Sequence, residues 1–467
     1  MTTRSAPEQL TTGTNSQNPY LSGNFAPVTE ELTAAGLPVE GTIPEGLEGR
    51  LLRIGPNPVT PVDPATYHWF TGTGMVHGLR LRDGRAEWYR NRYVRSDRVT
   101  EAKGWPPVTG PRHGEGDGTA NTNVIGHAGR TFAIVEAGAL PVELTDELET
   151  VARSDFGGTL PGAFTAHPKR DPATGELHAV AYHWQWDHLQ YLVIGNDATV
   201  RKTMEVPVVD GPMVHDVALT NTYAVLLDLP ATFDLERAMA GSSFPYAWNP
   251  DHPARVGLLP RDGDAGQVAW CEVEPCYVFH VLNAYDDAGT VVCDVVRHDK
   301  VFATDLLGPN EGPSTLARWR IDPVAGRVHE EVLSELSQEF PRHDERRTGL
   351  AHRYGYAAAV GAGVEHGPTL KHDLARGTTE AHHFGAGRVG LEPVFVPRSP
   401  DAPEDDGWIL SFVYDASTDR SDVVILAAQD FTGDPIATIH LPARVPFGFH
   451  GNWVPDDAPS SSGGTRP

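Results

Sequence analysis

The stretch Leu79–Tyr89 reads LRLRDGRAEWY, and it predicts two strands joined by a tight hairpin turn. Asp83-Gly84 is one of the dipeptides that fit the left-handed backbone of a two-residue turn. The residues before and after this dipeptide therefore form a natural antiparallel pair. The stretch indicates β-structure with short connections.

Similar strand signals recur over most of the chain. They are short, rich in β-branched and aromatic residues, and bounded by glycine, proline, asparagine or aspartate. The clearest are TFAIVE (Thr131–Glu136), LHAVAYH (Leu177–His183), YAVLLD (Tyr223–Asp228), TVVCDVV (Thr290–Val296), ILSFVY (Ile409–Tyr414) and VVILAA (Val423–Ala428). Helical signals are few and short, the best being Thr232–Ala240 and Asp146–Ala152.

So many strands with so little helix favour an all-β fold that closes by radial repetition. A β-propeller removes exposed sheet edges in this way, and large all-β folds often form a single domain. The 467 residues contain no visible WD or kelch repeat, so periodicity does not give the number of blades. We expect one domain over residues 24–455, between flexible segments at 1–23 and 456–467.

Composition excludes several classes of function. The chain has 62 acidic and 37 basic residues, a net charge of −25, which argues against nucleic acid as a partner because such binding needs a basic surface. The three cysteines show no zinc-type spacing, and their odd number argues against a disulfide framework. The first residues lack the apolar core of a signal peptide, and no apolar run is long enough to span a bilayer. We therefore expect a soluble, cytoplasmic protein.

Four of the 21 histidines lie beside apolar or aromatic strand-like stretches rather than in polar loops. They are His167 in FTAHPK, His215 in GPMVHDVALT, His280 in YVFHVLNAY and His450 in PFGFHGNWV. Their successive separations of 48, 65 and 170 residues suit different blades, whose inner strands converge on the propeller axis. Imidazole is a good ligand for iron, copper or zinc. The set predicts a metal site, and the alternative is four buried histidines with ordinary hydrogen-bond partners.

The motifs around these histidines resemble those of the carotenoid cleavage oxygenases, in order, from about Asn24 to Pro455. They include LEGRLLRIGPNP (Leu47–Pro58), YHWFTGTGMVHGL (Tyr67–Leu79), NRYVRS (Asn91–Ser96), ANTN (Ala120–Asn123), AIVEAG, VHDVALT, YVFHVLNAYDD, QEFPRHD, EPVFVPR and GFHGNWVP. One departure is FTGTGM (Phe70–Met75), where relatives often have FDGDGM.

The resemblance implies a seven-bladed propeller with Fe(II) on its axis, bound by the four histidines, and with short helices and loops capping one face above the metal. It also implies that Glu136, Glu339 and Glu392 accept hydrogen bonds from three of these rings and that His167 has no such partner. A carboxylate in this place fixes the ring tautomer and raises its basicity. Thr122 matches a threonine whose methyl group approaches an open position on the iron.

The resemblance further implies a dioxygenase that cuts a C=C bond of a hydrophobic alkene with O2 into two carbonyl products. Stilbene-cleaving members carry a lysine just before the first of these glutamates. This chain has Val135 there, which favours a carotenoid or apocarotenoid. Stilbenes and vinyl or propenyl phenols remain the alternative substrates, and a metal-free binding propeller is the alternative outside enzymes. Peripheral membrane contact through an apolar patch and the oligomeric state stay open. His68, His77, His382 and His383 are expected to be structural or exposed.

Overall fold

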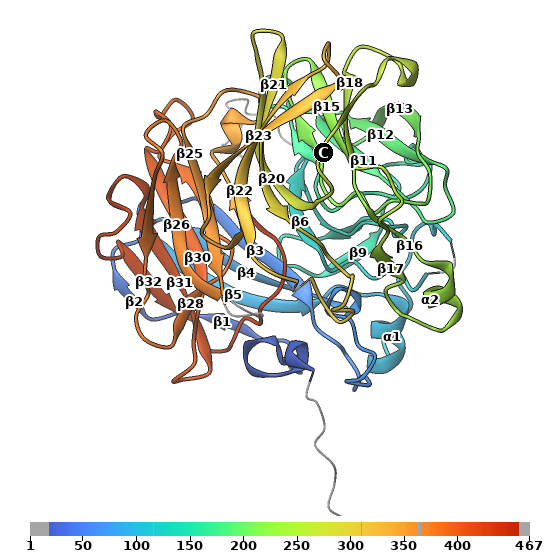
Figure 1. Cartoon of the computed structure of the whole chain (residues 1–467). Helices are drawn as coiled ribbons and strands as arrows, with labels where there is room; N and C mark the ends of the chain where they lie inside the picture. The colour runs from blue at the N-terminus through green and yellow to red at the C-terminus, as the bar shows by residue number, and fades with distance from the viewer. Residues whose placement is uncertain (1–17, 115, 310, 362–365, 457–467) are drawn as a thin grey trace, which may run out of the picture.

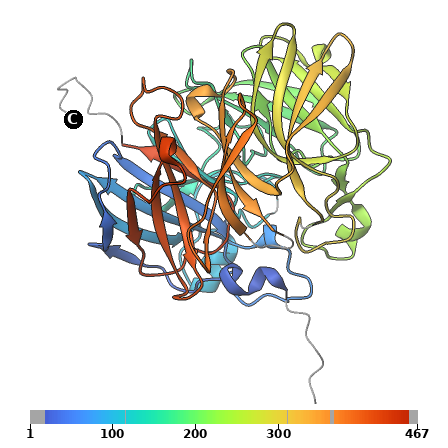
Figure 2. The same ribbon diagram turned by 60° about the vertical axis from the view of Figure 1, so that its left-hand side comes forward.

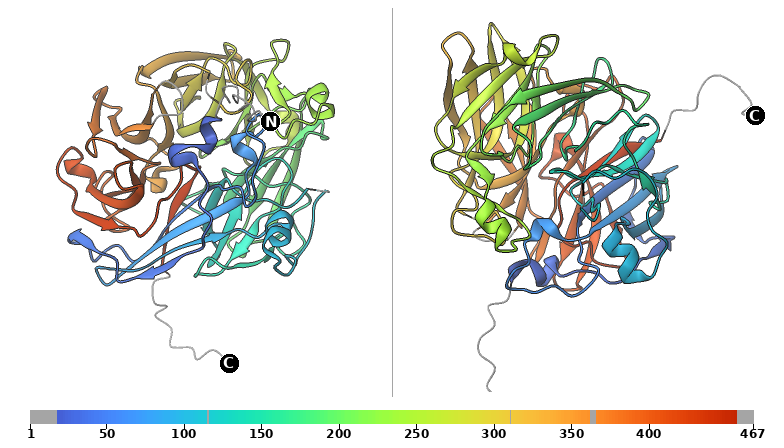
Figure 3. Two further views of the ribbon diagram at one scale, coloured as in Figure 1. Left: turned by 90° about the horizontal axis from the view of Figure 1, so that it is seen from below. Right: turned by 90° about the vertical axis from the view of Figure 1, so that its right-hand side faces the viewer.

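The computed structural model describes residues 18–114, 116–309, 311–361 and 366–456, and β-strands dominate this part of the chain (Figure 1). Within it the only α-helices are α1 (Asp97–Lys103) and α2 (Leu235–Met239), both short. Seen from below, the sheets surround a common centre (Figure 3, left). The expected all-β, propeller-like fold with few helices is therefore confirmed.

The hairpin predicted at Leu79–Tyr89 is present. Strand β4 (Gly74–Arg82) pairs antiparallel with β5 (Arg85–Tyr93), and Arg82 opposes Arg85 at the turn. Both turn residues adopt left-handed backbone conformations, with φ of 50° at Asp83 and 64° at Gly84. That geometry matches the right-handed twist of the strands it joins.

Three sheets come largely from the first half of the chain. In hydrogen-bonded order, the first contains β1 (Thr33–Ala35), β5, β4, β3 (Gly49–Pro56) and β33 (Gly451–Pro455). The second contains β6 (Asn123–His127), β7 (Arg130–Ile134), β8 (Val142–Leu144) and β9 (Thr150–Arg153). The third contains β10 (Lys169–Arg170), β11 (Leu177–Ala181), β12 (His188–Ile194) and β13 (Val200–Pro207).

The remaining sheets follow along the chain. An eight-stranded sheet runs β14 (Ala218–Leu219), β15 (Tyr223–Asp228), β18 (Arg255–Pro260), β19 (Ala269–Glu272), β23 (Arg327–Ser334), β22 (Ser314–Asp322), β21 (Thr290–His298) and β20 (Tyr277–Asp287). A small ribbon pairs β16 (Ala231–Phe233) with β17 (Tyr246–Trp248). The next sheet contains β24 (Gln338–Arg342), β25 (Tyr354–Val360), β26 (His366–Asp373) and β27 (Thr378–His382). The last sheet contains β2 (Val39–Gly41), β32 (Ala437–His440), β31 (Arg420–Ala427), β30 (Gly407–Asp415) and β28 (Arg388–Gly390), and β29 (Val394–Pro397) also pairs with β30.

The sheet count differs from the expected seven separate blades. Over the described residues, hydrogen bonding gives six sheets of at least four strands. The difference arises at the eight-stranded sheet, where two antiparallel four-stranded units are joined through one parallel pair, Glu272 with Arg327. Two neighbouring units thus share an edge instead of standing apart.

The two ends of the domain interlock. Strand β33, near the C-terminus, pairs with β3 of the N-terminal sheet, whereas β2 pairs with β32 of the C-terminal sheet. The blue N-terminal and red C-terminal sheets accordingly lie side by side (Figure 2). Each closing strand covers a sheet edge that would otherwise be exposed.

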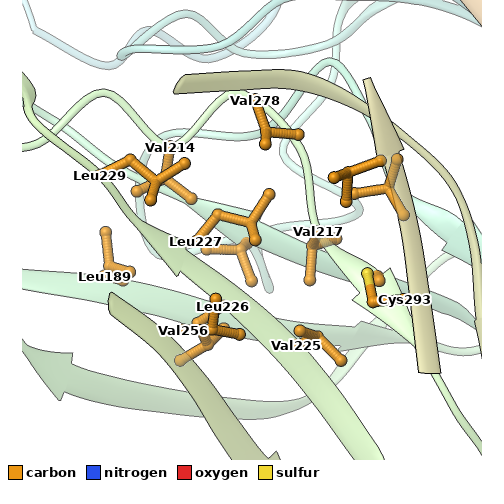
Figure 4. Close-up of a cluster of buried hydrophobic side chains, with 14 of the residues drawn as sticks. Leu189, Val214, Val217, Val225, Leu226, Leu227, Leu229, Val256, Val278 and Cys293 are labelled. Carbon is orange, nitrogen blue, oxygen red and sulfur yellow. The ribbon is translucent and has the colours of Figure 1, made fainter. Parts of the chain in front are cut away.

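A large apolar core holds neighbouring sheets together (Figure 4). It includes Leu189 from β12, Leu227 from β15 and Val278 from β20, each no more than 2% exposed. Fixing these sheets against one another also fixes β20, which carries His280, and the segment before β14, which carries His215.

One helix prediction is wrong and one needs shorter bounds. The predicted helix Asp146–Ala152 is a turn followed by β9, because the fully buried Leu148 has a left-handed φ of 70° that no helix allows. The predicted helix Thr232–Ala240 contains α2, but its first residues form β16. Helix α1 was not predicted, although Ser96 caps it in the usual way.

The two terminal segments expected to be flexible, 1–23 and 456–467, each include residues that the structure describes. Residues 1–17 and 457–467 lie outside the described residues. Residues 18–23 belong to the segment expected to be flexible, yet they include a 3-10 turn, η1 (Pro19–Leu21), in which Tyr20 is only 2% exposed. At the other end, Asp456 accepts hydrogen bonds from Arg80 and Arg82.

None of the helices in the described part of the chain combines the length and apolarity needed to cross a bilayer.

Candidate metal centre and its cavity

Four inner segments bring the predicted histidines to one point. His280 lies on β20, whereas His167, His215 and His450 lie in the short segments just before β10, β14 and β33. The segment that carries His450 is held on both sides, since its N–H donates to the carbonyl of Thr122 and its carbonyl accepts from Ile54. Residues far apart in sequence are thereby fixed around the centre.

The ring nitrogens face one another across the centre. The Nε2 atom of His215 lies 3.0 Å from Nε2 of His167 and 3.2 Å from Nε2 of His280. Nε2 of His280 lies 3.1 Å from Nε2 of His450. All four candidate ligand atoms lie within 4.8 Å of one another, and all four residues are buried.

Three of the rings are held from behind by the predicted carboxylates. Nδ1 of His215 lies 2.8 Å from Glu136, and Nδ1 of His450 lies 2.9 Å from Glu392. Nδ1 of His280 makes a very short contact with Glu339. Because a carboxylate accepts, each Nδ1 carries the proton, and the Nε2 lone pair points inward. Among the described residues no carboxylate contacts the ring of His167.

The electrostatics favour a cation at the centre. Burial lowers the pKa of His167 well below its ordinary value and that of His450 to about 4. Burial opposes ionisation of Glu392, but the charges of His450 and Arg342 outweigh it and lower the pKa to about 2. At His215 burial also opposes charge, but Glu136 outweighs it and raises the pKa. The rings of His167 and His450 thus resist protonation, and the ionised Glu392 adds negative charge beside the centre.

These residues fit a bound metal ion. Imidazole nitrogens lie about 2.1 Å from a first-row metal, so two of them at right angles are about 3.0 Å apart. That separation agrees with the observed Nε2 pairs of 3.0, 3.1 and 3.2 Å. Without a cation, inward lone pairs at this distance repel one another. Imidazole binds iron, copper or zinc, and a site without thiolate differs from a typical structural zinc site.

Thr122 lies beside the centre with its hydroxyl turned away. The hydroxyl donates to the side chain of Asn121 at 2.8 Å, and Asn121 in turn donates to two backbone carbonyls. Thr122 also lines the cavity described next.

A cavity of about 700 Å³ reaches the histidines from one side. Aromatic side chains dominate its wall near the centre, among them Phe70, Phe279 and Phe449. Val135 also lines it, directly before Glu136. Helix α2 contributes Leu235 and Met239, which are 60% and 81% exposed and so mark its mouth. Such a wall suits a long apolar ligand.

Two residues at the centre were not predicted from the sequence. His298, at the end of β21, donates from Nε2 to the second oxygen of Glu339 at 2.8 Å. Phe340 stacks on His280 with centroids 5.5 Å apart and has a left-handed φ of 57°. Such backbone strain in a bulky residue is typical of functional sites. The glutamate motif next to Phe340 was the available signal for it, whereas no motif marks His298.

The histidines left unassigned are structural or exposed, as expected. His77 is buried and lies 2.9 Å from the Tyr89 hydroxyl. His68 is buried in an aromatic cluster. His382 lies 3.0 Å from a backbone carbonyl, and His383 is exposed.

Comparison with known proteins shows the family to which the chain belongs. The chain matches the family described as retinal pigment epithelial membrane protein over residues 25–455. It is 45% identical to a carotenoid cleavage oxygenase of Mycobacterium tuberculosis over 94% of this chain and 98% of that protein. The fold matches the lignostilbene dioxygenase of Pseudomonas brassicacearum with a TM-score of 0.85 and 30% identity, covering 94% and 99% of the two chains. Cobalt-substituted ACO of Synechocystis, an apocarotenoid oxygenase, gives a TM-score of 0.82 and 29% identity, covering 92% and 97%. The chain belongs to the carotenoid cleavage oxygenase family.

Proposed function

We propose that this protein is an Fe(II)-dependent, non-haem dioxygenase that cleaves a C=C bond of a carotenoid or apocarotenoid with O2. The observation that carries the proposal is the ring of four buried histidines, held by three carboxylates and opening onto an apolar cavity. Bound Fe(II) would supply the electron exchange that lets O2 react with an electron-rich alkene.

The chain's own residues would hold and orient the reactants. The four imidazoles would bind the metal, and the three carboxylates would keep their Nε2 atoms directed inward. The Thr122 methyl group would occupy space beside the metal, and the aromatic wall would exclude water and align the alkene. The reaction balances, because four electrons pass from the alkene to O2 and each carbonyl product receives one oxygen atom.

Substrate choice rests on the wall of the cavity. It is mostly apolar, and Val135 cannot bind a phenolate as a lysine would. Both features favour a polyene. The similarity in fold to a lignostilbene dioxygenase supports the second candidate, cleavage of stilbenes or related phenolic alkenes by the same centre.

The direct experiment is turnover under ¹⁸O₂. Iron-loaded protein is incubated with an apocarotenal or with resveratrol, and the carbonyl products are identified by mass spectrometry. We expect one ¹⁸O in each product from the apocarotenal. Cleavage of the phenolic alkene alone would replace the substrate we favour.

Two further measurements test the centre itself. His280→Ala should abolish iron retention and turnover while circular dichroism and the unfolding midpoint show a folded domain. Wild-type protein that retains no iron and consumes no O2 would instead support a binding propeller.

We also infer that the eight-stranded sheet represents two blades, which gives seven around the axis. Its single parallel bridge supports this division.

A cytoplasmic location with transient contact to a membrane surface is our proposal for where the protein works. The exposed Leu235 and Met239 at the cavity mouth support the membrane contact, and cell fractionation tests the location.

A further inference from the structure

A second imidazole shares the carboxylate that orients a predicted metal ligand. Glu339 contacts Nδ1 of His280 through one oxygen and Nε2 of His298, at 2.8 Å, through the other. Neither Glu136 nor Glu392 joins two histidines in the described structure. His298 also lines the cavity, and an edge-to-face contact with Phe279 (centroids 5.3 Å apart) fixes its ring.

The hydrogen bonding sets the tautomer of His298. Each oxygen of Glu339 faces one imidazole nitrogen, so both oxygens act as hydrogen-bond acceptors. Nε2 of His298 therefore donates, and Nδ1 of the same ring is the nitrogen left to accept a hydrogen bond.

Nδ1 of His298 is available to accept a hydrogen bond from a molecule bound in the cavity. Nδ1 of His298 has no hydrogen-bond partner among the described residues, and it is not among the polar atoms sealed from contact in the interior. Since the ring lines the cavity, Nδ1 can reach a bound molecule. An acceptor on a fixed ring near the metal centre selects for a donor.

Several other polar side chains of the wall already have internal partners, whereas the hydroxyls of Tyr20 and Tyr246 are buried and have none among the described residues. The Thr71 and Ser314 hydroxyls donate to backbone carbonyls, and the Thr122 hydroxyl donates to Asn121. The Tyr182 hydroxyl is engaged by Glu136. Their donors and acceptors are thus less free for a substrate than the second nitrogen of His298.

We propose that Nδ1 of His298 accepts a hydrogen bond from a hydroxyl group of the substrate, so that the enzyme prefers alkenes carrying an alcohol or phenol over hydrocarbon analogues. This inference rests on the proposed function, because it assigns a substrate feature to the same cavity. It makes His298 a specificity-determining residue in addition to its contact with Glu339.

The test compares ligands that differ only in the hydroxyl. Binding of 4-hydroxystilbene and of stilbene, and of a hydroxylated apocarotenal and its parent, is measured by quenching of tryptophan fluorescence. The protein carries Co(II), so turnover is not needed. We expect wild-type protein to bind the hydroxylated member of at least one pair about tenfold more tightly, the size of one buried hydrogen bond. His298→Phe should remove that preference.

The control variant is Thr71→Val, which alters the same wall at a hydroxyl that already donates inward. It should keep the preference. A wild-type protein without any preference, or a His298→Phe protein that loses affinity equally for both members, would overturn the inference. The metal content of each variant is also measured, because loss of the contact between His298 and Glu339 could change metal binding separately from substrate binding. A preference without cleavage of any alkene by iron-loaded protein would refute the dioxygenase instead and leave the hydroxyl site standing.

Discussion

Glu339 and Glu392 hold their histidines in different ways. Glu392 accepts hydrogen bonds from His450, from the backbone N–H of Gly451 and from Arg342. Glu339 accepts hydrogen bonds from His280, from His298 and from the backbone N–H of Phe340. Each carboxylate is therefore anchored at several points. A change at either one misorients the ligand ring as well as altering the local charge.

Glu339→Gln should lower metal affinity by about tenfold to a hundredfold, the usual effect of losing such a partner. An amide cannot accept from both imidazoles at once as the carboxylate does. Competition with a chelator measures the change. Glu335→Gln, the same substitution at an exposed position four residues away, should bind metal like wild type. Equal affinities in the two variants would show that Glu339 does not orient a ligand.

Sequence reasoning reached most residues of the centre but not all. The histidines and glutamates lie in distinctive motifs, so they could be singled out. His298 could not, because it ends an ordinary strand and only three-dimensional packing brings it to Glu339. At Val135 the sequence showed only that a lysine is missing, and the three-dimensional structure was needed to place this residue in the cavity wall.

At the scale of elements, a close backbone approach positions His450. A Cβ atom on Gly448 would lie 2.8 Å from the Cα of Gly55 on β3, and a Cβ on Gly55 would lie 2.5 Å from the Cα of Gly448. Real side chains essentially never come so near to backbone. The two glycines therefore let the segment before β33 lie directly on β3.

Gly448→Ala should destabilise the protein by about 1–3 kcal/mol, the usual effect of overpacking, and should also reduce metal content because His450 shifts. Thermal unfolding and metal analysis measure both. The matched control is Gly116→Ala, where a Cβ meets nothing within 4 Å. Wild-type stability and metal content in the Gly448 variant would contradict the close-packing argument.

A buried histidine links the β15–β18 pair to a neighbouring loop. Nε2 of His252 lies 2.8 Å from Asp228, and Nδ1 lies 3.0 Å from Asp210. Burial by itself lowers the pKa of His252, but the hydrogen bonds and charges of both aspartates outweigh it and raise the pKa above 6.5. The folded protein thus holds this proton more tightly than the unfolded chain does.

The stabilisation from His252 should be complete below pH 6.5 and should be lost as pH rises through its raised folded-state pKa. Urea midpoints at pH 6 and pH 9 should therefore differ more for wild type than for His252→Asn. His329→Asn, at an exposed histidine, should follow wild type. An unchanged pH dependence in the His252 variant would count against the raised pKa.

Strands were easier to predict than helices. The pattern at Tyr223–Asp228 gave the bounds of β15, because a short apolar run bounded by turn residues defines a buried strand locally. Asp146–Ala152 failed because its helix-forming residues are overridden by tertiary packing, which buries Leu148 in a turn. The pairing of two strand units into one eight-stranded sheet depends on a single bridge and leaves no trace in the sequence.

At the scale of the whole molecule, the exposed apolar residues at the cavity mouth predict how the protein reaches its substrate. Replacing Leu235 and Met239 together by glutamate should reduce co-sedimentation with lipid vesicles. It should also slow cleavage of a vesicle-embedded carotenoid while leaving a detergent-solubilised one unaffected. Val324→Glu, at a residue 95% exposed elsewhere, serves as the control. Unchanged vesicle binding in the double variant would rule out this surface.

The interlocking of β2 with β32 and of β33 with β3 has a consequence for biosynthesis. His450 immediately precedes β33, so the fourth ligand is in place only when the last strand has left the ribosome and inserted beside the first sheet. A nascent chain stalled before residue 450 can present three of the imidazoles at most. Binding of a metal ion by all four imidazoles must then follow synthesis of β33.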